Sequence, residues 1–167
     1  MELFLVRHAI AEDGDPQRWP DDADRPLTEE GVELFRQAAR GLARIAPSVD
    51  AVLASPFARA WRTAEILAEE AGWPAPERCE ALEAGRPTAG LVKEIRQRQG
   101  LESLALVGHE PDLSELAARL LAGKEDALAI DMKKGGVASL VLQGETPAAY
   151  LRWLATPKIL RGLAPKS

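Results

Sequence analysis

The sequence predicts an α/β fold, a three-layer sandwich in which a mostly parallel central sheet lies between helices on both faces and ends in a C-terminal antiparallel hairpin. Three short, largely apolar runs, residues 3–6, 50–54 and 103–107, show no regular polar alternation, which is typical of strands buried on both faces. A segment with helical periodicity follows each run, as expected for parallel strands joined by crossover helices. Two further apolar segments, 137–142 and 149–154, predict the hairpin.

Length and composition restrict the protein to a few classes. The 167 residues fit one domain spanning 1–167 with one sizeable core. A formal net charge of −5 argues against a general binder of nucleic acid or of anionic membranes. The chain has neither a signal-like opening nor an apolar run long enough to cross a bilayer, so we expect a cytoplasmic protein without a membrane partner. Two histidines and one cysteine, Cys79, are a poor ligand inventory, so we expect no metal and no other cofactor.

A polar loop and a helix are expected after the first strand. Residues 11–26 are acidic and rich in proline, which is too polar for the core. Thr28 is expected to cap a helix that ends before Pro47. Its predicted buried face consists of Val32, Phe35, Ala39, Leu42 and Ile45.

The second strand is expected to run directly into a helix. Ser55 and Pro56 suit the N-cap and N1 positions, and the helix is expected to reach about Ala71 and to end at Gly72. The remaining expected segments are an irregular stretch at 73–87, helices at 88–99 and 111–121, a turn at 143–147 and a basic tail at 156–167.

Arginine and histidine side chains occur at three strand ends or strand–helix junctions. Arg7 and His8 end the first strand, Arg59 lies in the first turn after the second, and His109 follows the third. Taken singly, each arginine could also be a surface charge, and each histidine could be a polar residue at a strand end that hydrogen-bonds to backbone. Because ligands bind at the carboxyl ends of strands in open α/β sheets, we expect the four to converge if these strands are adjacent. Two guanidinium groups and two imidazoles with no evident carboxylate partner suit a tetrahedral dianion such as phosphate.

Such a cluster predicts phosphoryl chemistry. Repulsion from the arginines would lower the pKa of a nearby histidine, and a neutral imidazole is a nucleophile that can attack phosphorus. The second histidine, held cationic by the bound phosphate, would neutralise the developing charge. The sequence contains neither a glycine-rich nucleotide loop nor the paired acids of a metal-dependent phosphatase.

Four blocks of the sequence resemble the histidine phosphatase superfamily, which has the phosphoglycerate mutase-like fold. The first, Leu5-Val6-Arg7-His8-Ala9, resembles the Arg-His-Gly signature of that family. The others are residues 25–31, 55–65 and 107–111. The short length, the Arg-His-Ala-x-Ala-Glu-Asp opening and the Gly-His-Glu-Pro block are most similar to the SixA branch, the phosphohistidine phosphatases. The blocks occur in the family's order and cover nearly the whole chain.

The resemblance assigns roles to these residues. It implies that His8 is the nucleophile and becomes phosphorylated, while Arg7, Arg59 and His109 hold the phosphoryl group. Arg25 is implied as a neighbour of the pocket that binds substrate with them, although its acidic surroundings also fit a surface charge. The chain departs from the family pattern at two places. Ala9 replaces the usual glycine, and Arg62 stands where glutamine is common.

The general acid is not identified by the sequence. Larger branches of the family use a glutamate from an insert after the second helix. Glu83 or Glu80 could serve here, or neither, because the insert is short and neither residue matches a diagnostic motif. Phosphohistidine needs less help, since a protonatable imidazole is a good leaving group. The missing acid therefore fits a phosphoramidate substrate better than a phosphate monoester.

The resemblance implies a metal-independent phosphatase with a phosphohistidine enzyme intermediate. The expected partner is a protein phosphorylated on histidine, such as a histidine-phosphotransfer domain. Two alternatives are a phosphatase of small phosphorylated metabolites on the same site and a phosphate-binding module with little turnover. A mutase is not expected, because the short insert leaves little room for a second phosphate. Whether the 11–26 loop closes over substrate, and the oligomeric state, stay open.

Overall fold

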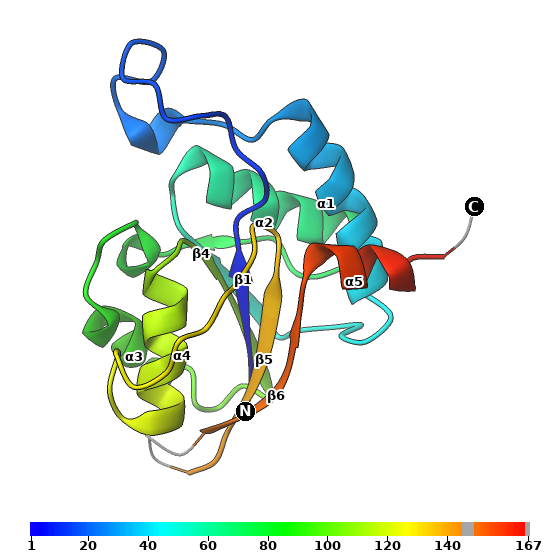
Figure 1. Ribbon diagram of the computed structural model, residues 1–167. Helices are drawn as coiled ribbons and strands as arrows, with labels where there is room; N and C mark the ends of the chain where they lie inside the picture. The colour runs from blue at the N-terminus through cyan, green and yellow to red at the C-terminus, as the bar shows by residue number, and fades with distance from the viewer. Residues whose placement is uncertain (145–148, 166–167) are drawn as a thin grey trace.

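A mixed six-stranded sheet forms the centre of the computed structural model, which describes residues 1–144 and 149–165 (Figure 1). The described strands are β1 (Glu2–Arg7), β2 (Ala51–Ala54), β3 (Glu77–Arg78), β4 (Ser103–Gly108), β5 (Val137–Leu142) and β6 (Ala149–Ala155). Their order across the sheet is β3-β2-β4-β1-β5-β6. The first four of these pair in parallel, whereas β5 is antiparallel to both β1 and β6. The predicted α/β class, parallel centre and hairpin are confirmed; most of the predicted hairpin turn, residues 145–147, lies outside the described residues.

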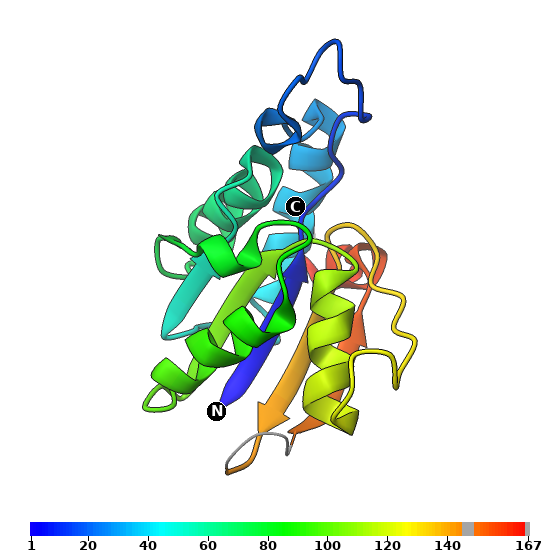
Figure 2. The ribbon, with the colours of Figure 1, turned by 90° about the vertical axis from the view of Figure 1, so that its left-hand side faces the viewer.

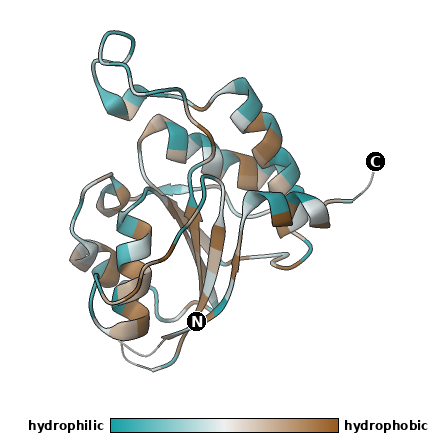
Figure 3. Cartoon of the chain, in the orientation of Figure 1, coloured by the Kyte–Doolittle hydropathy of each residue, from teal (hydrophilic) through white to brown (hydrophobic). Residues whose placement is uncertain are grey.

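Helices cover both faces of the sheet, which confirms the three layers (Figure 2). One face carries α1 (Glu29–Leu42), α2 (Ala58–Ala71) and α5 (Pro157–Leu163), and the other carries α3 (Thr88–Gln97) and α4 (Asp112–Ala122). Phe4 and Val6 belong to the first core, whereas Leu3 and Leu5 belong to the second, because successive strand residues point to opposite faces. The central strands are therefore hydrophobic along their length (Figure 3).

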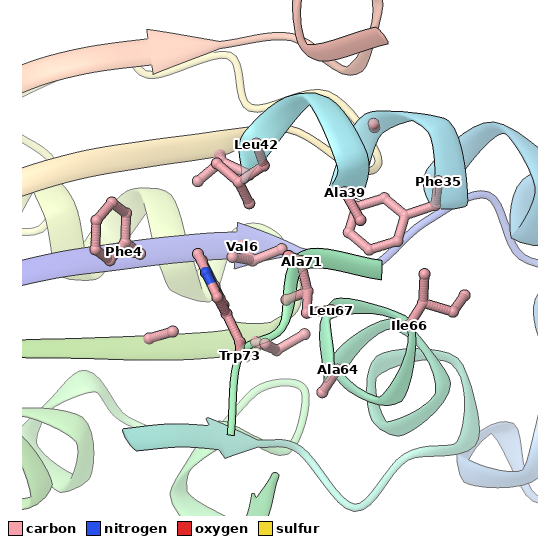
Figure 4. Packing of buried hydrophobic residues seen from close by; sticks show 14 of the residues in the cluster. Phe4, Val6, Phe35, Ala39, Leu42, Ala64, Ile66, Leu67, Ala71 and Trp73 are labelled. Carbon is pink, nitrogen blue, oxygen red and sulfur yellow. The ribbon is translucent and has the colours of Figure 1, made fainter. Parts of the chain in front are cut away.

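The first core packs around aromatic rings from distant parts of the chain. Phe4 of β1 lies beside Trp73, with ring centroids 5.5 Å apart (Figure 4). The Trp73 indole N–H donates to the Ala46 carbonyl at 2.9 Å, which satisfies its buried polar atom. This packing fixes α2 and the segment after it against β1.

The predicted start of α1 is confirmed. Thr28 Oγ1 accepts a hydrogen bond from the Gly31 N–H at 2.8 Å and caps the helix. The predicted residues Phe35, Ala39 and Leu42 are buried and Val32 is half-buried. The prediction that Ile45 is buried is wrong. The helix ends at Leu42, and Ile45 lies beyond it with 43% of its surface exposed.

Helix α1 crosses α5 at a glycine, and this contact gives a stability prediction. A Cβ on Gly41 would lie 1.7 Å from the backbone oxygen of Leu160. Gly41→Ala must push the two backbones apart, so we expect it to lower the free energy of unfolding by about 1–3 kcal/mol. Gly162→Ala, on α5, is the matched control, because a Cβ there meets nothing within 4 Å. Thermal unfolding of both variants checks this; an unchanged Tm for Gly41→Ala would contradict the close crossing.

The predicted start of the second helix is wrong. α2 begins at Ala58 with Phe57 as its N-cap, and Ser55 lies before the helix. Ser55 Oγ accepts the Phe57 N–H at 3.2 Å and also lies within hydrogen-bond distance of His109. Ser55 therefore lies at the sheet edge and not in the first turn of the helix. The predicted end is confirmed, since Gly72 has a φ of 71°.

Short elements were missed in segments without clear periodicity. The stretch 73–87, predicted as irregular, contains β3 and a 3-10 turn, η2 (Glu80–Leu82). The basic tail contains α5, which Thr156 caps. None of the described helices is long and apolar enough to cross a membrane.

The register of the sheet places the histidines together. Arg7 of β1 pairs with Gly108 of β4, so His8 and His109 leave adjacent parallel strands at the same edge. On the other side of β4, the Ser55 N–H donates to the Val107 carbonyl at 3.0 Å. The 11–26 loop projects beyond this edge, and its 3-10 turn, η1 (Asp22–Asp24), packs against α2 (Figure 1). The predicted convergence of the three strand ends is thus present.

Candidate active site

His8 is buried in a position that leaves one ring nitrogen for chemistry. Its backbone N–H donates to the Gly108 carbonyl at 3.0 Å, which fixes the residue at the end of β1. Its Nδ1 lies 2.7 Å from the Ala9 carbonyl oxygen. A carbonyl only accepts hydrogen bonds, so Nδ1 carries the proton and the neutral ring has its lone pair on Nε2.

The pKa of His8 keeps the ring neutral. Burial, helped by the positive charges of Arg59, Arg7 and Lys134, lowers its pKa to about 4, although the bond to the Ala9 carbonyl acts in the opposite direction. Repulsion from the arginines was predicted, but burial is the larger cause. A neutral imidazole at physiological pH is the form that can act as a nucleophile.

Alanine is accommodated after His8. The Ala9 N–H donates to Thr63 Oγ1 at 3.0 Å, and Thr63 in turn donates to the Arg59 carbonyl at 2.7 Å. No non-glycine residue among those described has a positive φ, so this turn does not need the conformational freedom of glycine. The departure from the family's Arg-His-Gly pattern therefore leaves the backbone unstrained.

His109 lies beside His8, with ring centroids 5.3 Å apart. Its Nε2 is 2.9 Å from Ser55 Oγ. Ser55 Oγ accepts the Phe57 N–H and still has its own proton and a second lone pair, so its contact with Nε2 fits either neutral tautomer of His109. The other ring nitrogen of His109, Nδ1, is buried without a hydrogen-bond partner in the described chain. Burial and the charges of Arg59 and His8 lower the His109 pKa to about 3, so the ring is neutral before an anion binds.

Arg7 is held by the loop that precedes β5. Its Nη1 donates to the Met132 carbonyl at 2.7 Å, and its Nε is buried with no partner among the described residues. The Gly135 N–H donates to the carbonyls of Arg7 and His8, at 3.1 and 2.9 Å. Residues 132–135 therefore frame the side of the site opposite α2.

Arg59 is 4% exposed and has a carboxylate partner. Its Nη2 lies 2.9 Å from Asp22 Oδ2, and its Nη1 donates to the Asp22 backbone oxygen at 2.8 Å. The predicted absence of a carboxylate partner is wrong, because the acidic loop folds back over the cluster. Arg59 Nε stays buried without a partner in the described chain. The guanidinium also lies over the Phe57 ring, 5.3 Å from its centroid.

Arg25 joins the rim of this cluster. Its Nε bonds Asp22 Oδ1 at 2.7 Å and its Nη1 donates to the Glu12 carbonyl at 2.8 Å. Arg25 therefore shares Asp22 with Arg59, which places it where the sequence predicted a neighbour of the pocket.

Of the two glutamates considered as general acids, one is paired with an arginine and the other is exposed. Glu83 forms an ion pair with Arg86 at 2.8 Å, and Glu80 is exposed on η2. Arg62 lies on α2 and pairs with Glu65 and Glu69, as expected for a surface charge. Cys79 is buried in the second core, and burial raises the pKa of its thiol.

The arrangement is suited to an anion. Three of the four buried side-chain nitrogens that lack a partner in the described chain belong to this cluster, namely Arg7 Nε, Arg59 Nε and His109 Nδ1. Buried donors without partners are costly, and a bound oxyanion would satisfy those of the two arginines. No group of three or more potential metal ligands occurs among the described residues.

Sequence reasoning missed three residues of the site. Asp22 is one of several acids in the 11–26 loop, and nothing in the sequence distinguishes it. Ser55 was assigned to helix capping, although its place directly after a strand could have indicated the sheet edge. Lys134, whose charge acts on His8, precedes a glycine pair that marks a tight loop at that edge.

The pKa values lead to a pH prediction. Both imidazoles have a pKa below the ordinary value for histidine, so the neutral forms persist as pH falls and are lost only near pH 4 for His8 and pH 3 for His109. NMR of the imidazole nitrogens in the anion-free protein should therefore show both rings neutral at about pH 5.5. A ring that titrates near 6.5 would contradict the burial and charge argument.

Comparisons with known proteins agree with this geometry. The family model of the histidine phosphatase superfamily (branch 1) matches residues 3–84. An uncharacterised protein from Picosynechococcus is 35% identical over 143 residues, which cover 84% of each chain. Phosphohistidine phosphatase SixA from Escherichia coli is 28% identical over 162 residues, 94% of each chain. A solved structure of the protein histidine phosphatase SixA with tungstate has a TM-score of 0.83 and 25% identity, covering 95% of this chain and 98% of that one.

Proposed function

Because the chain belongs to the histidine phosphatase superfamily and is a phosphatase of the SixA type, we propose that it removes phosphate from protein phosphohistidine through a covalent intermediate on His8. One observation carries the proposal: His8, with its lone pair on Nε2, lies in a cluster in which three buried side-chain nitrogens have no partner in the described chain. The similar SixA structure contains tungstate, a tetrahedral oxyanion like phosphate.

In the first step, His8 Nε2 attacks the phosphorus atom of the substrate. A bond forms between Nε2 and phosphorus, and the bond from phosphorus to the leaving imidazole breaks with its electron pair on that imidazole. The departing imidazole takes up a proton. Since His8 is neutral at physiological pH, no base has to remove a proton from Nε2 first.

Arg7, Arg59 and His109 form a phosphoryl clamp, which lowers the barrier by stabilising the negative charge that develops on the phosphoryl oxygens. Arg7 and Arg59 carry permanent positive charge and each keeps an N–H without a partner in the described chain. Protonation of His109 when phosphate binds, which stays a prediction, would make its Nδ1 a further donor. Preorganised donors in a buried site act more strongly than they would in water.

In the second step, water attacks the phosphorus of phospho-His8. A bond forms between the water oxygen and phosphorus, and the bond to Nε2 breaks with its electron pair on Nε2. The protons of the water leave with the released phosphate or pass to solvent, and His8 returns to its neutral form with the proton on Nδ1. No step uses a metal ion.

The chemistry of the leaving group supports the proposed substrate class. Glu83 is engaged by Arg86, and Asp22, whose pKa is lowered through its bond to Arg25, is ionised at physiological pH. A phosphate monoester needs a proton delivered to its leaving oxygen. In phosphohistidine, a phosphoramidate, the leaving group is an imidazole, which is protonated readily. We therefore propose a histidine-phosphotransfer domain or a similar phosphorylated protein as the partner, in the cytoplasm.

A direct comparison of substrates tests the proposal. The purified protein is given a histidine-phosphotransfer domain phosphorylated on histidine and, separately, phosphoserine, and kcat/KM is measured for each. We expect a preference of at least about 100-fold for the phosphohistidine protein, since general acid catalysis contributes roughly 10²-fold or more. A reversed preference would favour a metabolite phosphatase, and phosphate binding without turnover of either would favour a binding module.

A further inference from the structure

Asp22 connects the 11–26 loop to the phosphoryl clamp. Its carboxylate bonds two arginines, Oδ2 to Arg59 Nη2 at 2.9 Å and Oδ1 to Arg25 Nε at 2.7 Å. Its backbone oxygen accepts a third bond, from Arg59 Nη1 at 2.8 Å. Arg59 is nearly buried, whereas the Asp22 side chain is 56% exposed, so the carboxylate closes the outer side of the clamp.

The bonds to Asp22 use the two terminal nitrogens of the Arg59 guanidinium and leave its Nε unbonded. A guanidinium offers five N–H groups, and Asp22 takes one from each terminal nitrogen. Arg59 Nε, on the remaining edge, is buried without a partner in the described chain. The guanidinium carbon, Cζ, lies over the Phe57 ring, 5.3 Å from the ring centroid. The two bonds from Asp22 thus hold the terminal nitrogens of the guanidinium, and Nε remains for an anion.

We infer that Asp22 is a positioning residue, which orients Arg59 so that the Nε edge meets the phosphoryl group. This inference rests on the proposed function of the cluster. Arg25 supports the arrangement, because it joins the Asp22 carboxylate to the Glu12 carbonyl at the other end of the loop. The 11–26 loop would therefore act on the reaction through the Asp22 carboxylate.

This role predicts opposite effects on turnover and on anion binding. Loss of the Asp22 charge frees the guanidinium to leave its catalytic orientation, and a misplaced group costs about 10- to 100-fold in rate. The same loss makes the site more positive, so inorganic phosphate should bind as tightly as before or more tightly. A residue that only stabilises the loop would instead weaken turnover and binding together.

The test compares Asp22→Asn with Asp24→Asn, a matched loss of one charge two residues away on the same loop, where the side chain is exposed. For both variants and the wild type, kcat is measured with a phosphohistidine protein, the inhibition constant with inorganic phosphate, and the Tm by thermal unfolding. We expect kcat to fall at least about tenfold in Asp22→Asn alone, with phosphate binding retained or tighter and with the Tm close to wild type.

The outcomes separate the inference from the proposed function. If the wild type and Asp24→Asn turn over substrate and Asp22→Asn matches them, the inference is wrong and the function stands. If kcat and phosphate affinity fall together in Asp22→Asn with a lower Tm, Asp22 is structural and the inference is also wrong. If the wild type fails to turn over substrate, the proposed function fails and the inference fails with it.

Discussion

His8→Ala should lower kcat/KM for a phosphohistidine protein by at least about 10⁴-fold, the scale seen when a covalent nucleophile is removed. The variant lacks the Nε2 lone pair that attacks phosphorus, and water cannot replace it at the same position. The Arg7, Arg59 and His109 side chains remain, so inorganic phosphate should still bind. Steady-state kinetics and phosphate titration of the same preparation check both parts.

The phosphate titration is the control for this variant. Binding that persists while turnover is lost separates loss of the nucleophile from loss of the fold. Turnover within about tenfold of the wild type in a phosphate-binding His8→Ala protein would remove His8 from the covalent role.

Arg59→Ala should cost about 3–4 kcal/mol of transition-state stabilisation, or a fall of about 10²- to 10³-fold in kcat/KM, as expected for one removed donor to a developing oxyanion. Arg59→Lys should recover only part of this loss, because an ammonium keeps the charge but cannot hold Asp22 and the phosphoryl group with separate nitrogens. The measurement is kcat/KM for both variants.

Arg62→Ala is the matched control for Arg59. It removes the same side chain one turn along α2, where Arg62 pairs with Glu65 and Glu69 away from the histidines. We expect near-normal kcat/KM there. Equal losses at both positions would mean that α2 tolerates no such change, and normal activity in Arg59→Ala would take Arg59 out of the clamp.

Much of the fold could be predicted from the sequence because the strands that matter are buried on both faces. Leu3 and Leu5 enter one core, and Phe4 and Val6 enter the other. Because both faces of β1 are buried, its sequence is a continuous apolar run, which is the pattern that predicted the strand. The short β3 and the seven-residue α5 carry too few residues for a periodicity to appear. Ile45 followed the helical spacing of α1, but that helix ended before it.

The site was predictable to the extent that it depends on strand ends. Arg7 at the end of β1, His8 directly after it and His109 directly after β4 could be predicted from those positions, and their convergence follows from the parallel pairing of the two strands. Asp22 could not be chosen among the acids of the 11–26 loop, because its contact with Arg59 depends on how the loop folds over α2. Ser55 shows a different limit, since a serine before a proline fits a helix cap and a hydrogen bond to His109 equally well.

The most direct test of the account is to trap the phosphoenzyme. The wild type and His8→Ala are exposed briefly to phosphoramidate, quenched rapidly at alkaline pH and analysed as intact proteins by mass spectrometry. The account predicts one phosphoryl group on the wild type alone, stable in alkali and lost in acid, as a phosphohistidine is. An adduct of equal amount on His8→Ala would contradict it, and so would a wild type that neither gains a phosphoryl group nor consumes the donor.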